Sequence, residues 1–279
     1  MAQSPYRLDP RACPSCLRPR PPLLDGQRSG VQHRDRGPSP RSAFIRATKI
    51  VQIYETRLRS IAKHIGDILG AHDVASLIGS SAASAALRRY ADTVAPWAEA
   101  VAERMVRETA ARDERSWFKV ASRMGRELKR EIQAAPTGQV MRSLQTEQVI
   151  LIRSIPLDAA ERVQTLAREG LSQGMRAETL AKAIMEGEGV SRSKATLIAR
   201  TECGRAATTL TRARAEHVGS THFRWITVGD SDVRASHKKL NGKVFRWDDP
   251  PVCDEPDLKA LPGAIFNCRC YPEPILDDL

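Results

Sequence analysis

The sequence has few aromatic residues and no long apolar stretch. Phe, Trp and Tyr make up 5% of its 279 residues, and alanine is abundant, a combination that favours helices. No segment approaches the roughly 20 apolar residues needed to cross a bilayer, and the amino terminus lacks the apolar core of a signal peptide. We therefore expect a protein that is made and kept in a cytoplasm and has no membrane partner.

Sequence patterns of common active sites are also missing. The chain contains no nucleophile elbow, no phosphate-binding glycine loop and no His-Glu-x-x-His pattern. Spacings typical of helix-turn-helix or zinc-finger DNA-binding proteins are absent as well. These absences argue against an enzyme and against a plain host DNA-binding protein. The six cysteines, in a reducing compartment, are either free thiols or metal ligands.

Positive charge is in clear excess. The formal net charge is +11 and the isoelectric point is near 9.7. A charge of this size is unfavourable in a compact particle unless an anionic partner offsets it, and nucleic acid is the commonest such partner. The alternative is a set of charged, solvated helical faces, because the arginines are spread along the chain.

The first segment, residues 1–46, is rich in proline, arginine, glycine and serine and has no sustained apolar period. This composition predicts a basic tail that is disordered or becomes ordered on a partner. It contains Cys13 and Cys16 at the spacing of a zinc knuckle, but no second Cys or His pair follows at knuckle distance. A metal site in the tail is therefore the weaker interpretation.

Residues 47–190 show helical periodicity and predict a helical domain. A stripe of apolar residues from Ile50 to Leu69 predicts a long first helix. Trp97 and Trp117 fall in a second helical pattern, and we expect them to be core residues and not a binding platform. Breaks are expected at Pro136, at Pro156 and at Gly170, followed by a short helix over 176–186.

Residues 191–279 predict a long helix followed by a small module. Ser191 is suited to cap a helix that runs to about His217. The segments 222–228 and 243–247 alternate and are rich in strand-forming residues. The expected fold class is therefore α+β, with a mostly helical amino-terminal body and a small α+β carboxy-terminal module of few strands.

Four segments in order carry a family resemblance. These are Ile198-Ala-Arg-Thr-Glu202, Asp230-Ser-Asp-Val-Arg-Ala-Ser-His237, Leu240-Asn-Gly242 and Asn267-Cys-Arg-Cys270. In this combination the region from Lys194 to Pro274 resembles the Mu F-like phage head morphogenesis family. The motif residues are Arg200, Thr201, Glu202, Asp230, Arg234, His237, Gly242, Asn267, Cys268, Arg269 and Cys270.

The resemblance implies a minor capsid protein of a tailed phage or prophage. Such a protein would act in head morphogenesis at the portal or the capsid interior, and would help to stabilise or release packaged DNA. Its partners would be the portal protein, the major capsid protein and double-stranded DNA, in the host cytoplasm during assembly and then in the virion head. A metal-dependent nuclease or hydrolase that uses Asp230, Asp232, His237, Glu202 and Cys268 is the alternative, and we expect no enzyme.

Zinc is the cofactor that the motif residues suggest. His237, Cys268 and Cys270 offer the nitrogen and sulfur ligands that zinc prefers, with Cys253 as a possible fourth. The competing interpretation has no metal: Asp230, Arg234 and His237 would fasten a turn to the Asn267–Cys270 segment through hydrogen bonds and packing.

The charged residues of the long helix suggest two further roles. Arg200 and Glu202 point in different directions on a helix, and Glu202 is expected to pair with Arg205 or Arg234 and so fix the helix to the module. The alternative is two solvated charges. The basic run is predicted to contact DNA phosphates without sequence preference, and consists of Lys194, Arg205, Arg212 and Arg214.

Overall fold

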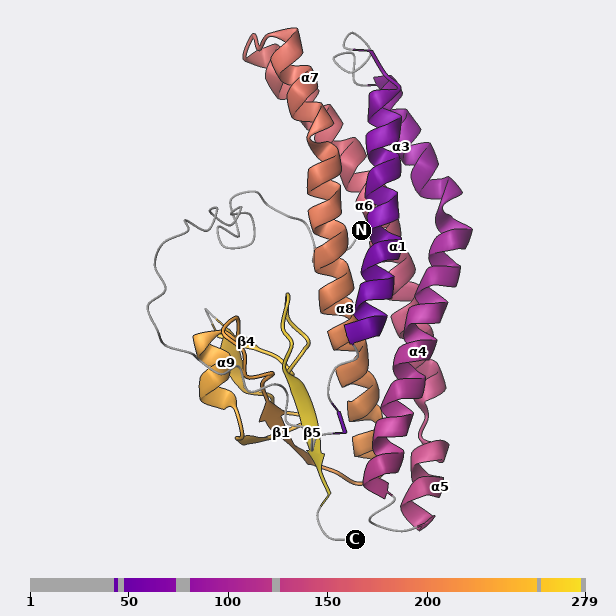
Figure 1. Ribbon diagram of the computed structural model, residues 1–279, viewed down its shortest axis with the longest axis vertical. Coiled ribbons are helices and arrows are strands. Elements are labelled where there is room, and N and C mark those ends of the chain that lie inside the picture. The colour runs from indigo at the N-terminus through magenta and orange to yellow at the C-terminus, as the bar shows by residue number, and fades with distance from the viewer. Residues whose placement is uncertain (1–42, 45–47, 74–80, 122–125, 255–256, 277–279) are drawn as a thin grey trace, which may run out of the picture.

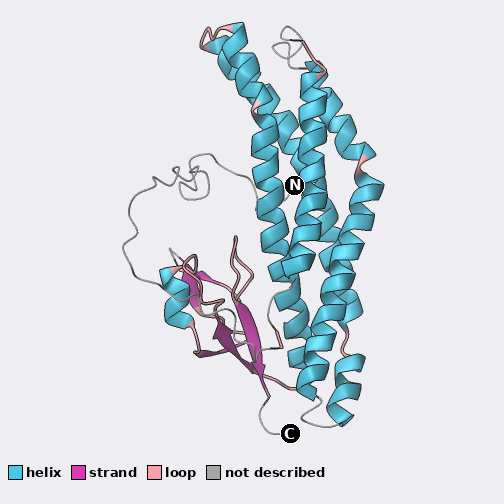
Figure 2. Ribbon diagram, in the orientation of Figure 1, coloured by secondary structure: helices cyan, strands magenta, loops and turns pink. Residues whose placement is uncertain are grey.

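In a computed structural model, the chain forms a long helical bundle with a small strand-containing module beside one end of it (Figures 1 and 2). The structure describes residues 43–44, 48–73, 81–121, 126–254 and 257–276. Most of the predicted tail, with Cys13 and Cys16, therefore lies outside the described residues. The helices are α1 (Thr48–Gly70), α3 (Ser81–Thr93), α4 (Ala95–Ala121), α5 (Arg126–Ala134), α6 (Thr137–Ser172), α7 (Ala177–Met185), α8 (Gly187–His217) and α9 (Ala235–Leu240).

Helix α1 forms where the apolar stripe predicts it. Its buried side chains recur every three or four residues, as do Leu58, Ile61 and Ile65, and they pack in the main core with α8. Trp117 in α4 is fully buried, whereas Trp97 is half-buried at the edge of the main core. None of the described helices is long and apolar enough to span a membrane.

Helix α6 corrects two predicted breaks. It runs unbroken through Pro156 and Gly170, and ends at Ser172. Pro156 removes one backbone hydrogen bond, but it is buried beside Ile155 in the bundle, so packing offsets that deficit. At Gly170 a Cβ atom would lie 3.0 Å from both methyl carbons of Leu180. The glycine therefore allows α7 to approach α6 closely instead of ending the helix.

Helix α8 begins at Gly187, five residues before the start that a cap at Ser191 predicts. It follows α7 after the single residue Glu186, and Ser191 lies inside it, buried, so Ser191 is not the cap. The predicted domain boundary between residues 190 and 191 thus falls within a continuous helix.

Helix α8 buries charged side chains at three levels along its length. Lys194 pairs with Asp158 and donates to the Ser154 hydroxyl at 2.8 Å. One level on, the buried Glu202 accepts from Gln148 of α6. Near the end of the helix, Arg214 pairs with a carboxylate of α4. Each buried charge has a partner, as charge burial in a low-dielectric interior requires.

The module is built on a short antiparallel sheet. Strands β1 (His222–Ile226), β2 (Val244–Arg246) and β5 (Tyr271–Ile275) pair in the order β2-β1-β5, and β3 (Val252–Asp254) pairs with β4 (Leu258–Lys259). The two predicted strands are confirmed, and so is the fold class: a mostly helical body followed by a small module of few strands.

A second core joins the module to the helical body. It contains Trp117 of α4 and Ile132 of α5 together with Phe223, Trp225 and Trp247 of the module. Phe223 and Trp247 have ring centroids 4.7 Å apart. Because residues from both parts fill this one core, the module and the end of the bundle formed by α4 and α5 stabilise each other.

The loop from Pro262 to Asn267 lies directly on α8. The Thr208 hydroxyl donates to the Pro262 carbonyl at 2.6 Å, and the Asn267 amide donates to the Thr201 hydroxyl at 3.1 Å. Between them, a Cβ atom on Gly263 would lie 2.8 Å from the Cys270 carbonyl oxygen and 3.1 Å from Thr208 Oγ1. Small side chains on both partners make this close approach possible.

The substitution Asp113→Asn should destabilise the fold by about 3–5 kcal/mol, because it leaves the buried guanidinium of Arg214 without its charge partner. Burial raises the pKa of Asp113 to about 6, against the influence of Arg214 and Thr211, so unfolding by urea is best measured at pH 8, where the carboxylate is ionised. Glu216→Gln, which breaks the exposed Arg212–Glu216 pair, is the control and should cost below about 1 kcal/mol. Equal costs would contradict the assignment.

The substitution Gly263→Ala should cost at least about 1 kcal/mol more than Gly219→Ala. Both glycines have a φ of 84°, so the backbone strain of adding a Cβ atom is matched. The new Cβ atom meets a backbone oxygen at Gly263 and has nothing within 4 Å at Gly219. Thermal unfolding of the two variants measures the difference, and identical midpoints would show that the loop does not lie on α8 as described.

Candidate functional site

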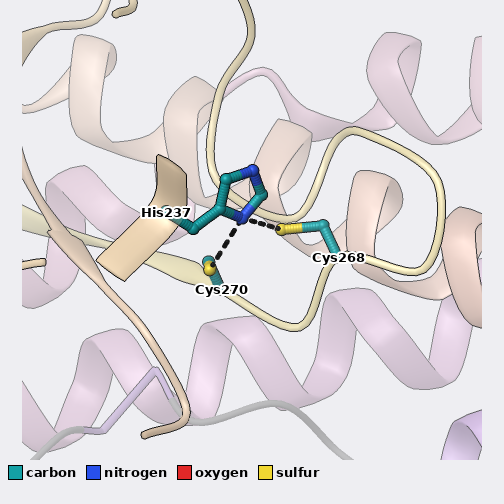
Figure 3. Close-up of side chains that lie close together, drawn as sticks. All are labelled: His237, Cys268 and Cys270. Carbon is teal, nitrogen blue, oxygen red and sulfur yellow. Dashed lines mark hydrogen bonds between the residues drawn. The ribbon is translucent and has the colours of Figure 1, made fainter. Parts of the chain in front are cut away.

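The motif residues after β1 face the Asn267–Cys270 segment. Asp230 forms a salt bridge with Arg269 at 2.6 Å, and the Arg234 guanidinium donates to the Phe266 carbonyl at 3.0 Å. His237 extends from α9 toward the two cysteines of the same segment (Figure 3). The predicted turn containing His237 is thus a short helix, α9, for which Arg234 is the residue before the first turn.

His237, Cys268 and Cys270 form a compact buried cluster. The Nδ1 atom of His237 is 3.5 Å from the Sγ atom of each cysteine, and the three ligand atoms lie within 4.8 Å of one another. The side chains are 2%, 2% and 5% exposed, respectively. Arg269, between the two cysteines, points away to Asp230 and Asp232, so alternation of the extended segment directs both sulfurs inward.

The cluster also shifts the proton affinities of its members. Hydrogen bonding from Cys270, and then from His237, lowers the pKa of Cys268 to about 4 against the effect of burial. Burial opposes a charged imidazole, but contacts with Cys253 and Cys268 outweigh it and raise the pKa of His237 to about 9. The hydrogen bond with Cys268, together with burial, raises the pKa of Cys270 well above its usual range.

Two asparagines of the motif shape turns around this cluster. Asn267 has a φ of 54°, the left-handed region that asparagine tolerates better than most residues. Asn241 accepts a hydrogen bond from the Thr227 amide at 2.9 Å. Gly242, with a φ of 80°, donates its amide to the Trp225 carbonyl at 2.8 Å. These residues connect α9 to β2 and the loop to β5.

Glu202 is held within the helical body. It forms a salt bridge with Arg205 at 2.7 Å and accepts from Gln148 at 2.6 Å, and Gln148 in turn accepts from Tyr54 at 2.9 Å. The predicted buried pair of Glu202 with Arg205 is confirmed, but it does not fix the helix to the module: the Glu202 side chain joins α8 to α6 and, through Gln148, to α1. Arg200 lies 3.7 Å from Glu55 of α1.

The predicted DNA-binding residues of α8 are each paired with a carboxylate. Lys194 and Arg214 are buried and paired with carboxylates, so the prediction that they meet phosphates is wrong. Arg205 pairs with Glu147 as well as Glu202, and Arg212 pairs with Glu216 at 2.7 Å. Lys194, Arg205 and Arg214 thus join α8 to neighbouring helices, whereas the Arg212–Glu216 pair is exposed on α8 itself.

The acidic residues of the alternative enzyme site lie in two places. Asp230 and Asp232 are 2.6 Å and 3.4 Å from Arg269, whereas Glu202 lies in the interior of the bundle. Among the described residues, the group of potential metal ligands that lie close together is His237, Cys268 and Cys270.

Sequence reasoning missed several residues that build the site. Gly263 donates its amide to Cys268 Sγ at 3.4 Å, and the Trp225 ring packs edge-on against His237 with centroids 5.3 Å apart. Thr208 anchors the loop from α8. Gly263 follows Pro262 in a loop near the motif, which was a usable signal, whereas nothing in the local sequence marks Thr208.

The chain is similar to known proteins over its carboxy-terminal part. The family described as "Phage Mu protein F like protein" matches residues 161–272, which run from the second half of α6 into β5. An uncharacterized protein of Haemophilus influenzae is 32% identical over 128 residues, which are 46% of this chain and 28% of that protein. The chain thus spans little more than a quarter of this relative's length. No solved structure matches the chain.

All of the motif residues lie within the matched segment: Arg200 to Glu202, Asp230 to His237, Gly242 and Asn267 to Cys270. The structure brings most of these residues together where α8 meets the module. We conclude that this segment of the chain, residues 161–272, is similar to the Mu F-like protein family of phages.

Proposed function

We propose that this chain is a minor head protein of a tailed phage or prophage that acts at the portal or the capsid interior. The observation that carries the proposal is the family match, which covers α7, α8 and most of the module. Proteins of the phage head morphogenesis family are structural. Assembly in the host cytoplasm and a final location in the virion head follow from the same proposal.

The end of the bundle that carries α7 offers a contact surface for another head protein (Figure 1). Large exposed hydrophobic side chains occur over residues 171–190: Leu171, Met175, Met185 and Val190. Exposed apolar side chains that gather on one part of a surface favour a protein partner. All four lie within the matched segment.

The double substitution Leu171→Ser/Met175→Ser should reduce copurification of the full chain with its cognate portal or major capsid protein several-fold. Leu171 is 65% exposed, so the variant should keep the wild-type unfolding midpoint. Ile150→Ser is the matched control, since Ile150 is 60% exposed on the same helix but lies outside the matched segment. Coexpression and affinity capture measure both variants. A wild-type chain that captures neither head protein would contradict the proposed function.

We further propose that the tail, and not α8, contacts packaged DNA. Residues 1–46 contain nine arginines and three aspartates, which account for more than half of the net charge of +11. The four basic residues of α8 are already paired with carboxylates. Guanidinium groups on a proline-rich segment suit phosphate contacts without sequence preference.

Replacing the eight arginines between Arg7 and Arg41 by glutamine should weaken binding to double-stranded DNA. The slope of log K against log salt should become shallower by about 0.9 for each phosphate that the tail no longer neutralises. Arg212→Gln/Glu216→Gln removes a paired charge from each side, keeps the net charge, and should leave affinity and slope unchanged. Fluorescence anisotropy over a range of salt concentrations measures both; an unchanged slope in the tail variant would exclude the tail as the DNA contact.

A further inference from the structure

Two of the three distances within the buried His237, Cys268 and Cys270 cluster match the edges of a zinc tetrahedron. Zinc–sulfur bonds of about 2.3 Å and zinc–nitrogen bonds of about 2.05 Å place tetrahedral N and S ligands about 3.5–3.6 Å apart. In the structure, His237 Nδ1 is 3.5 Å from Cys268 Sγ and 3.5 Å from Cys270 Sγ. Figure 3 shows the nitrogen directed at both sulfurs.

A hydrogen-bonded cluster without metal explains this arrangement less well. A ring nitrogen carries at most one hydrogen, which can point directly at one acceptor, yet Nδ1 is equally distant from two sulfurs. A cation between Nδ1 and the sulfurs would use one lone pair from each of the three side chains.

The surroundings of the cluster are those of a closed structural site. The Gly263 amide donates to Cys268 Sγ at 3.4 Å, as backbone amides do to metal-bound thiolates. The Trp225 ring lies edge-on at 72° to the His237 ring and fixes its plane. Because all three side chains are buried, the site has no open position for a substrate.

A fourth sulfur lies in the same core. Cys253 of β3 is buried, contacts His237, and donates its thiol to the Leu258 carbonyl at 3.4 Å. It belongs to the second core together with Cys268 and Cys270. Closed zinc sites are four-coordinate, and a set of three cysteines and one histidine is among their common forms.

We propose that His237, Cys268 and Cys270 bind a structural zinc ion, with Cys253 as the fourth ligand. Two or three sulfurs and one imidazole favour zinc over magnesium or calcium, which take oxygen ligands. The ion would join α9, β3 and the segment before β5, three short elements of the module. This inference rests on the geometry of the cluster and is independent of the proposed head function.

The metal content of the purified full chain tests the site directly. The wild-type chain, prepared without added metal or chelator, should contain about one zinc per chain by mass spectrometry of the elements. Cys268→Ser and Cys270→Ser should each lose most of the zinc, and Cys253→Ser should lower zinc affinity at least about tenfold. Cys203→Ser is the matched control: Cys203 is buried in the main core, away from the cluster, and its replacement should leave the zinc content unchanged.

Two measurements do not depend on the cysteine variants folding. His237→Cys replaces one zinc ligand by another and should retain zinc, whereas His237→Gln should lose it. In the wild-type chain, exchange of zinc for cobalt should give the visible absorption of a tetrahedral site with thiolate ligands. A wild-type chain that lacks zinc, binds none on addition, or contains a Cys268–Cys270 disulfide would overturn the proposal, as would full zinc retention in Cys268→Ser.

Discussion

The paired buried charges of α8 are the constraint on which the rest of the structure depends. Lys194, Glu202 and Arg214 lie in the interior at three levels, and each would be strongly unfavourable there without its partner on α6 or α4. Their partners must therefore take fixed positions around α8. A helix surrounded in this way is covered on several sides, which is why it can support the bundle on one side and the module on the other.

Most residues of the family motif lie where α8 contacts the end of the module. The Thr201 hydroxyl accepts a hydrogen bond from the Asn267 amide, and Arg269, between the two cysteines, forms a salt bridge with Asp230. Glu202 instead joins the bundle. Neighbouring residues of a single motif thus serve two separate interfaces. The conformation of the Asn267–Cys270 segment, in turn, directs both sulfurs to His237.

Much of the fold could be predicted from local patterns, since the stripe of α1 and the alternation of β1 reflect one buried face each. The helix breaks predicted at Pro156 and Gly170 do not occur, because packing against distant residues overrides the local preferences of proline and glycine. Strands β3 and β4, of three and two residues, are too short to show a period.

The candidate site could be predicted in part, because His237, Cys268 and Cys270 have few other common uses in combination. The burial of Arg214 could not be predicted, because its partner Asp113 is 101 residues away along the chain and no local pattern connects the two.

The shared second core has a consequence for the order of folding. Trp117 emerges from the ribosome more than a hundred residues before Trp225 and Trp247, with which it shares that core. Until those residues are synthesised, the end of α4 leaves much of the Trp117 indole uncovered. Contacts of such long sequence separation form late and slowly. The second core is therefore completed only after Trp225 and Trp247 have been synthesised, and a chain terminated before them would expose a surface prone to aggregation.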